Sequence, residues 1–256
     1  MSKVPLLLAI CLTSTAALPD INQGRIVGGT VATASEYPYI AKILYASDHV
    51  NYRPVCVGAI INNRSILTGR VCWSAPNNQV LLFLAQVGYV NATNIGSLHS
   101  IAQLIQHSSY NSWNQAHSLG ILRVTTIIYF GTYVRPIPLA PLDYTLPDHE
   151  NVVAIGLSST TATSELQLNA VELRTINQDR CEMVYGMNFL SPDMVCAGWE
   201  TGGRGLCHGD IGAPLVHNNV LVGITAYTHG CGDGNFPSVF TRLYQPMTVS
   251  WLEGNS

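Results

Sequence analysis

Short runs of β-branched and aromatic residues recur along this chain and are separated by Gly, Pro and Asn. The clearest runs are residues 39–46, 80–90, 119–130, 152–160, 221–228 and 238–243. Runs of this length, bounded by turn residues, are typical of strands. Helical periodicity is scarce, and residues 245–254 are the best candidate for a short helix. The chain is therefore expected to fold as an all-β protein.

A proline-rich stretch, residues 134–143, divides the strand pattern near its middle. A β-rich chain of 256 residues forms either one compact unit or two small barrels that share an interface. The stretch suits a connector between two such barrels.

The N-terminal segment has the layout of a secretory signal. One lysine precedes an apolar run, residues 4–12, which is followed by small residues, with cleavage expected after Ala17. The run is too short to cross a bilayer, which needs roughly 20 apolar residues. We expect a secreted, extracellular protein without a membrane span, and a buried N-terminal helix is the alternative.

Removal of this signal also removes Cys11 and leaves an even set of cysteines for an oxidising compartment. Six cysteines allow about fifteen pairings, so the residues alone leave the connectivity open. The sequence has no Cys-x-x-Cys pair, so the cysteines do not indicate a metal site.

The charged fraction is 11% and the net charge is -3, without a block of basic residues, which argues against a nucleic-acid partner. No cofactor or metal is expected.

Three stretches then carry a resemblance. They are "GRIVGG" at 24–29, the segment between Cys56 and Cys72, and "GDIGAP" at 209–214. In this order they resemble motifs of the trypsin/chymotrypsin family of serine proteases, and the resemblance runs from Arg25 to the C-terminus. It implies two antiparallel six-stranded β-barrels with a cleft between them and a short C-terminal helix. The disulfides it implies are Cys56–Cys72, Cys181–Cys196 and Cys207–Cys231.

The resemblance also implies a zymogen-like organisation. Residues 1–17 are the expected signal peptide, residues 18–25 the activation peptide, and residues 26–256 the peptidase domain. Cleavage after Arg25 would free the amino group of Ile26, which would pair with Asp210. In the family, the corresponding ion pair orders the loops of the cleft.

The catalytic positions that the resemblance implies are occupied by unexpected residues. Acyl transfer needs a nucleophile, a base and a group that orients the base. The matching positions hold Ile211, Val71 and Ser118, and the oxyanion-hole positions are Gly209 and Ile211. We expect Val71 and Ile211 to pack together, which indicates a catalytically inactive member of the family, of invertebrate type, and hence not an enzyme. Relocated catalysis through His117 or His208 is the alternative at this site.

The positions of the specificity pocket differ from those of a protease that selects basic residues. They are Gly205 at the floor and Thr228 and Ser238 on the walls. The pocket has no acidic floor and has a β-branched residue on one wall. If a peptide segment docks in the cleft, the side chain that enters this pocket, its anchor, should therefore be small and apolar.

Three functions follow from these residues. The preferred hypothesis is a monomeric pseudoprotease that binds a protein partner, namely a protease, a protease inhibitor or a cascade component, as regulator, adaptor or inhibitor sink. The alternatives are an active serine-type endopeptidase, as family membership alone implies, and a bulk secreted protein without a specific ligand. The sequons at Asn63 and Asn91 are expected glycosylation sites.

Overall fold

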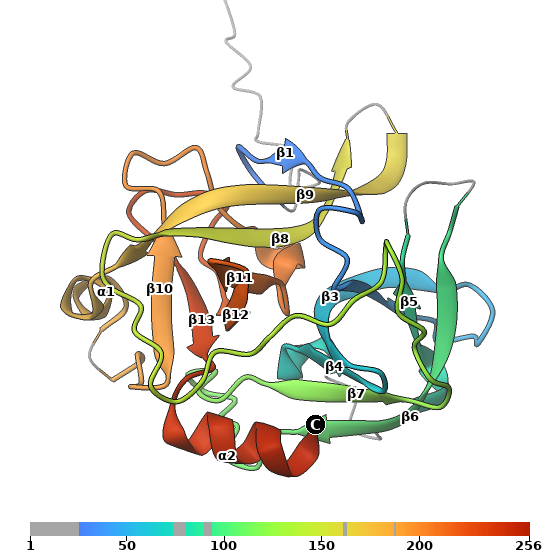
Figure 1. Cartoon of the computed structure of the whole chain (residues 1–256). Helices are drawn as coiled ribbons and strands as arrows, with labels where there is room; N and C mark the ends of the chain where they lie inside the picture. Colours follow the sequence, from blue (N-terminus) through green and yellow to red (C-terminus); the bar gives the residue numbers. More distant parts are fainter. Residues whose placement is uncertain (1–25, 74–79, 90–93, 161–162, 187) are drawn as a thin grey trace, which may run out of the picture.

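The computed structural model describes residues 26–256, except 74–79, 90–93, 161–162 and 187. Two β-barrels lie side by side, with the N-terminal barrel on the right and the C-terminal barrel on the left of Figure 1. The expected all-β fold of two antiparallel six-stranded barrels is confirmed. The expected signal and activation peptides lie outside the described residues.

The N-terminal barrel closes in the order β2-β3-β4-β7-β6-β5. Its strands are β2 (Ile40–Tyr45), β3 (Arg53–Asn62), β4 (Ser65–Thr68), β5 (Phe83–Val87), β6 (Ser97–Gln106) and β7 (Gly120–Val124). All of its pairings are antiparallel. Aliphatic residues from opposite strands, among them Ile43, Ile60 and Leu122, fill the interior without exposure to solvent. Burial of such side chains is the main stabilising contribution to a barrel of this kind.

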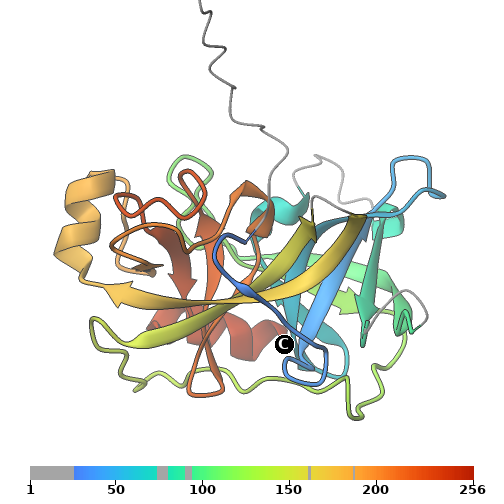
Figure 2. The ribbon, with the colours of Figure 1, turned by 90° about the horizontal axis from the view of Figure 1, so that it is seen from above.

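The C-terminal barrel contains β8 (Asn151–Thr160), β9 (Thr163–Ile176), β10 (Met194–Gly198), β11 (Pro214–His217), β12 (Val220–Tyr227) and β13 (Ser238–Arg242). Pairing of β8 with both β9 and β11 closes the ring. The short strand β1 (Thr30–Val31) adds to the edge of β9. The start of the described chain therefore lies on the C-terminal barrel, although β2 begins the other one (Figure 2).

A third apolar cluster joins the two barrels. It combines Leu67 and Ile121 from the N-terminal barrel with Ile155 and Leu221 from the C-terminal barrel, all fully buried. Since these side chains at the interface are as fully buried as those of the N-terminal core, we expect the two barrels to behave as one unit. The proline-rich stretch crosses between the barrels at the front of Figure 1, as the sequence predicts.

Two α-helices complete the fold. Helix α2 (Pro246–Asn255) confirms the predicted C-terminal helix and packs Leu252 and Trp251 against the cluster between the barrels. Helix α1 (Gln178–Tyr185) has no counterpart among the predicted elements. Its start is set by Asn177, whose side chain accepts a hydrogen bond from the backbone N–H of Arg180. With eight residues and one buried side chain, Cys181, this helix has no apolar periodicity to reveal it.

Candidate functional site in the cleft

The site is built from one segment of the N-terminal barrel and one turn of the C-terminal barrel. After β4 the chain enters a 3₁₀-helix, η1 (Arg70–Trp73), and before β11 it forms a second one, η3 (His208–Asp210). A Cβ at Gly69 would lie 3.1 Å from the Cγ2 of Ile211. The two segments are therefore in direct contact, and the lack of a side chain at residue 69 permits the close approach.

Val71 lies in η1 and is half-buried. It lines a cavity of about 370 Å³ beside the Cys56–Cys72 disulfide, together with the aromatic rings of Tyr45, Trp73 and Phe83. The valine side chain has no atom that accepts a proton, so Val71 contributes only apolar surface to the site.

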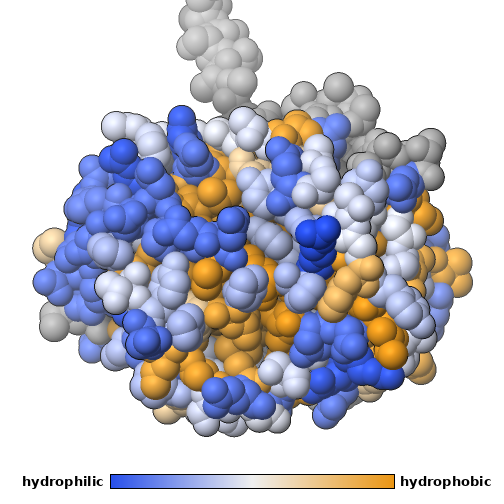
Figure 3. Space-filling view, in the orientation of Figure 1, coloured by the Kyte–Doolittle hydropathy of each residue, from blue (hydrophilic) through white to orange (hydrophobic). Residues whose placement is uncertain are grey.

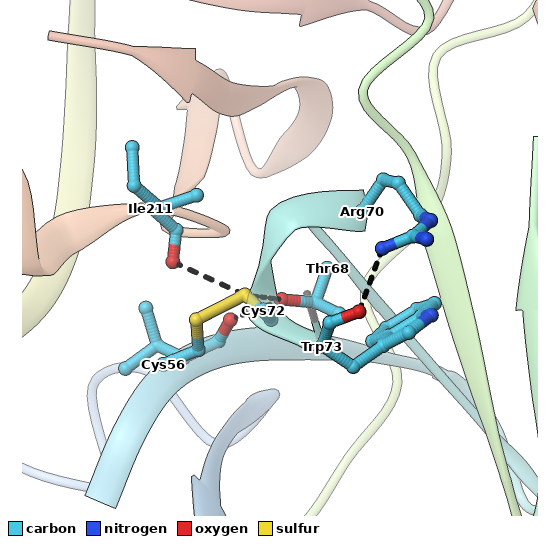
Figure 4. The surroundings of a disulfide bond; sticks show 7 residues. Cys56, Thr68, Arg70, Cys72, Trp73 and Ile211 are labelled. Atoms are coloured by element: carbon cyan, nitrogen blue, oxygen red, sulfur yellow. Dashed lines mark hydrogen bonds between the residues drawn. A yellow bond between two sulfur atoms is a disulfide. The ribbon is translucent and has the colours of Figure 1, made fainter. Parts of the chain in front are cut away.

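Ile211 follows η3 and is also half-buried. Its side chain packs against the core cluster of the N-terminal barrel, and its carbonyl oxygen faces the disulfide, 3.7 Å from the Sγ of Cys72 (Figure 4). The sequence predicts that Val71 and Ile211 pack together. The structure places both side chains beside Cys72, Val71 on a cavity and Ile211 on the barrel core.

Ser118 lies just before β7 and is fully buried. Its carbonyl oxygen accepts a hydrogen bond of 3.3 Å from the backbone N–H of Arg70, the residue before Val71. Among the described residues its hydroxyl has no hydrogen-bond partner. Ser118 and Ile211 therefore both lie beside the start of η1, the segment that contains Val71.

A histidine pair lies next to Ser118. The rings of His107 and His117 stack with centroids 4.7 Å apart, and the ring of Trp251 lies 4.9 Å from His107. The Nδ1 of His117 is 3.2 Å from the Oδ2 of Asp193, which also accepts the backbone N–H of His117 at 2.7 Å. These contacts hold His117 against Asp193, so relocated catalysis through this histidine gains no support.

Burial, and to a lesser degree the nearby His117, lowers the pKa of His107 to about 4. An unfolded histidine binds a proton near pH 6.5, so between pH 6.5 and 4 the unfolded state holds more protons at this residue. We expect the free energy of unfolding to fall by roughly 1–3 kcal/mol as the pH drops through this window. Urea unfolding at pH 7 and pH 4.5 should show a smaller pH dependence in His107→Gln. An identical dependence in both proteins would contradict the assignment.

The three residues at the expected pocket positions are all buried. Gly205 is buried, and a Cβ there would lie 2.6 Å from the Cα of Gly232. Thr228 and Ser238 are 2% and 6% exposed, and the hydroxyl of Thr228 has no hydrogen-bond partner among the described residues. The backbone of Gly232 therefore fills the space beside residue 205, and residue 205 has no side-chain charge.

The two residues of the expected activation pair both lie next to the Cα of Gly156. A Cβ at Gly156 would lie 2.5 Å from the Oδ1 of Asp210 and 3.2 Å from the Cδ1 of Ile26. Asp210 is fully buried, and its Oδ2 accepts the backbone N–H of Cys207 at 3.0 Å. Val27 exchanges two backbone hydrogen bonds with Gly205, at 2.9 and 3.1 Å. This segment is therefore docked directly behind the 209–211 turn. Arg25, the expected cleavage residue, lies outside the described residues.

The three expected disulfides, Cys56–Cys72, Cys181–Cys196 and Cys207–Cys231, are confirmed. The first fixes η1 to β3, and the third ties the segment before η3 to the loop after β12. Both bonds thus hold the site together.

Sequence reasoning missed Trp73, which is 2% exposed. Its ring occupies the space where Gly120 would carry a Cβ, only 1.9 Å from the Cη2 atom. The indole thereby packs η1 against the start of β7 at Gly120. A tryptophan directly after Cys72 was visible in the sequence, but its partner is 47 residues away in the chain.

No group of three or more His, Cys, Asp or Glu side chains among the described residues is placed to hold a metal ion. In the same part of the chain, no helix is long and apolar enough to cross a membrane.

Two closed antiparallel barrels, with a site where their loops meet, define the class of double-barrel serine proteases. Comparison with known sequences gives the same result. The family profile described as Trypsin matches residues 26–252. The chain is 37% identical to "Trypsin CFT-1" of Choristoneura fumiferana and 32% identical to "Trypsin, alkaline C" of Manduca sexta, with 98% of each chain covered in both cases. It is 36% identical to "Achelase-1" of Lonomia achelous, over 78% of this chain and 95% of that protein. The chain belongs to the trypsin family.

The prediction that this chain is not an enzyme is contradicted by these relatives. Four of them, 32–37% identical over the whole chain, are named trypsins, which points to a serine endopeptidase. The prediction rested on three single residues, assigned to their roles from short motifs. Similarity that extends over both barrels outweighs such an assignment.

Proposed function

We propose that the mature chain is a secreted protein that takes an extended segment of a protein substrate or inhibitor into the cleft between its barrels, and acts on it as a serine-type endopeptidase of its family. The main support from the structure is the docking of residues 26–27 behind the 209–211 turn. The support for endopeptidase activity comes from the relatives named trypsins.

Binding and hydrolysis make different demands on this site. Binding requires a cleft and a pocket that accepts an anchor side chain. Hydrolysis also requires a nucleophile and a base within hydrogen-bond reach of each other. Val71 and Ile211 supply neither group, so the nucleophilic hydroxyl and the proton acceptor must come from other residues. For hydrolysis, the support comes from the comparisons with known proteins alone.

The pocket favours a small apolar anchor. At the position proposed for the floor, Gly205 brings no negative charge, and at the position proposed for one wall, Thr228 has a buried β-branched side chain. Burial of a Lys or Arg side chain without a counter-charge costs several kcal/mol. Loops anchored by Ala or Val should therefore bind the Arg25-cleaved chain at least about tenfold more tightly than loops anchored by Lys or Arg.

The test is a calorimetric titration of the cleaved chain with inhibitor loops that differ only at the anchor. Peptides with the same anchors are assayed for hydrolysis, and a serine-directed phosphonate locates any nucleophile by mass spectrometry. Thr228→Gly is the matched variant and should widen the range of anchors that bind. Hydrolysis of the peptides, together with a residue labelled by the phosphonate, supports the whole proposal. Binding of the loops without hydrolysis would overturn the proposed endopeptidase activity. Absence of both binding and hydrolysis would overturn the whole proposal.

A further inference from the structure

The turn between β3 and β4 carries the sequon Asn63-Arg64-Ser65 on the outside of the N-terminal barrel. Asn63 and Arg64 are both exposed, and the side chain of Asn62 accepts the backbone N–H of Arg64 at 2.9 Å. This turn precedes β4, whereas η1 of the site described above follows β4.

The chain that follows β7 runs directly beside this turn. The backbone N–H of Val124 donates to the carbonyl of Arg64 at 3.0 Å, and the backbone N–H of Ile128 donates to the carbonyl of Asn63 at 2.8 Å. The guanidinium of Arg64 reaches the carbonyl of Thr125 at 3.2 Å. The segment is thus fixed against the sequon by backbone contacts.

Ile128 points into the barrel core and is 1% exposed, whereas its neighbours face solvent. Ile127, Tyr129 and Phe130 are 39%, 84% and 49% exposed. In the orientation of Figure 1, apolar residues reach the surface along the right-hand barrel and across the middle of the molecule (Figure 3). Exposed apolar side chains gathered in one short segment offer a surface to which a ligand of matching chemistry can bind.

A sugar attached to Asn63 is suited to cover these rings. The face of an aromatic ring carries partial negative charge, which attracts the polarised C–H groups on the face of a pyranose. The hydroxyl groups of the sugar stay in water, so the cover is compatible with a solvent-exposed surface.

We propose that Asn63 carries an N-linked glycan whose first sugars pack against Tyr129 and Phe130. The donor is a polyprenyl-diphosphate-linked oligosaccharide, used by the transferase of the secretory pathway. The amide nitrogen of Asn63 forms a bond to the anomeric carbon, the bond from that carbon to the diphosphate oxygen breaks, and the diphosphate leaves with the electron pair. The amide proton passes to a base of the transferase.

Modification must precede folding of this hairpin. Ser65, the third residue of the sequon, is fully buried in β4, and its hydroxyl accepts a hydrogen bond of 2.9 Å from the guanidinium of Arg123. A transferase that must contact this hydroxyl reaches it only in the unfolded chain. Protein that has folded without the glycan should therefore resist modification by added transferase and donor.

The experiment uses the full chain secreted from a eukaryotic host, in an Asn91→Gln background. Asn91, the other predicted site, lies outside the described residues. Mass spectrometry should find carbohydrate on the peptide that contains Asn63. Enzymatic removal of the glycan should lower the melting temperature by about 2–4 °C, and this loss should disappear in Tyr129→Ser.

The matched control is Trp113→Ser, which removes an aromatic ring that is 67% exposed and belongs to a different loop. It should keep the full loss of melting temperature on deglycosylation. Absence of carbohydrate on Asn63 would overturn the proposal, as would an equal loss in Tyr129→Ser and the parent. The outcome is independent of binding or hydrolysis in the cleft, so a failed cleft assay leaves this test unaffected.

Discussion

Cleavage after Arg25 is expected to raise the melting temperature of this protein, and Asp210→Asn is expected to abolish the rise. Cleavage gives Ile26 a positively charged amino group, and Ile26 and Asp210 already meet at Gly156. Asp210 is fully buried. Removing one partner from a buried ion pair costs about 3–5 kcal/mol, so the pair formed by the new amino group should stabilise the fold. The cleaved form should gain an amount of this order, measured by calorimetry on intact and fully cleaved protein.

Gly156→Ala provides a second variant that leaves both charges in place. Its Cβ would lie 2.5 Å from the Oδ1 of Asp210, so the carboxylate and Ile26 would have to separate. Cleavage should then stabilise this variant less than the parent. If the intact and cleaved parent melt at the same temperature and resist proteolysis equally between Cys181 and Cys207, the activation segment has no structural effect.

Trp73→Ala is expected to cost about 3–5 kcal/mol of unfolding free energy, the range found for large aromatic residues replaced in cores. The indole is 2% exposed and belongs to the core cluster of the N-terminal barrel. Its loss leaves a cavity opposite Gly120, where the backbone has no side chain to fill it. Urea unfolding, followed by a probe other than tryptophan fluorescence, measures the loss.

Two further variants separate packing from other effects of the Trp73 substitution. Trp73→Phe keeps an aromatic ring and should lose less stability than Trp73→Ala. Gly120→Ala places a Cβ against the indole and should destabilise the parent, because overpacked cores lose typically 1–3 kcal/mol. In the Trp73→Ala background the same change should cost less. Equal costs of Gly120→Ala in both backgrounds would show that the ring and residue 120 do not share this space.

The activity of the chain could not be predicted from single residues. Ser118 and Ile211 lie beside the start of η1, which contains Val71. The conclusion drawn from these three residues, that the chain is no enzyme, is contradicted by relatives named trypsins over its full length. A short motif assigns a role to one position at a time, whereas catalysis depends on which groups the whole cleft brings within reach of a substrate.

The sequence by itself determined the all-β class, the two-barrel division, the C-terminal helix and, through the family motifs, the three disulfides. The all-β class and the helix follow from short-range patterns, because alternation of side chains and turn residues act within a few positions of the chain. The two six-stranded barrels and the disulfide pairing were implied by the resemblance to the family. Tertiary structure alone decided that Trp73 fills the space at Gly120, that His107 stacks on His117 and that the ring of Trp251 contacts His107. It also placed the 124–128 segment beside Asn63. These contacts join residues far apart in the chain, and they depend on strand register and barrel closure, which no local pattern encodes.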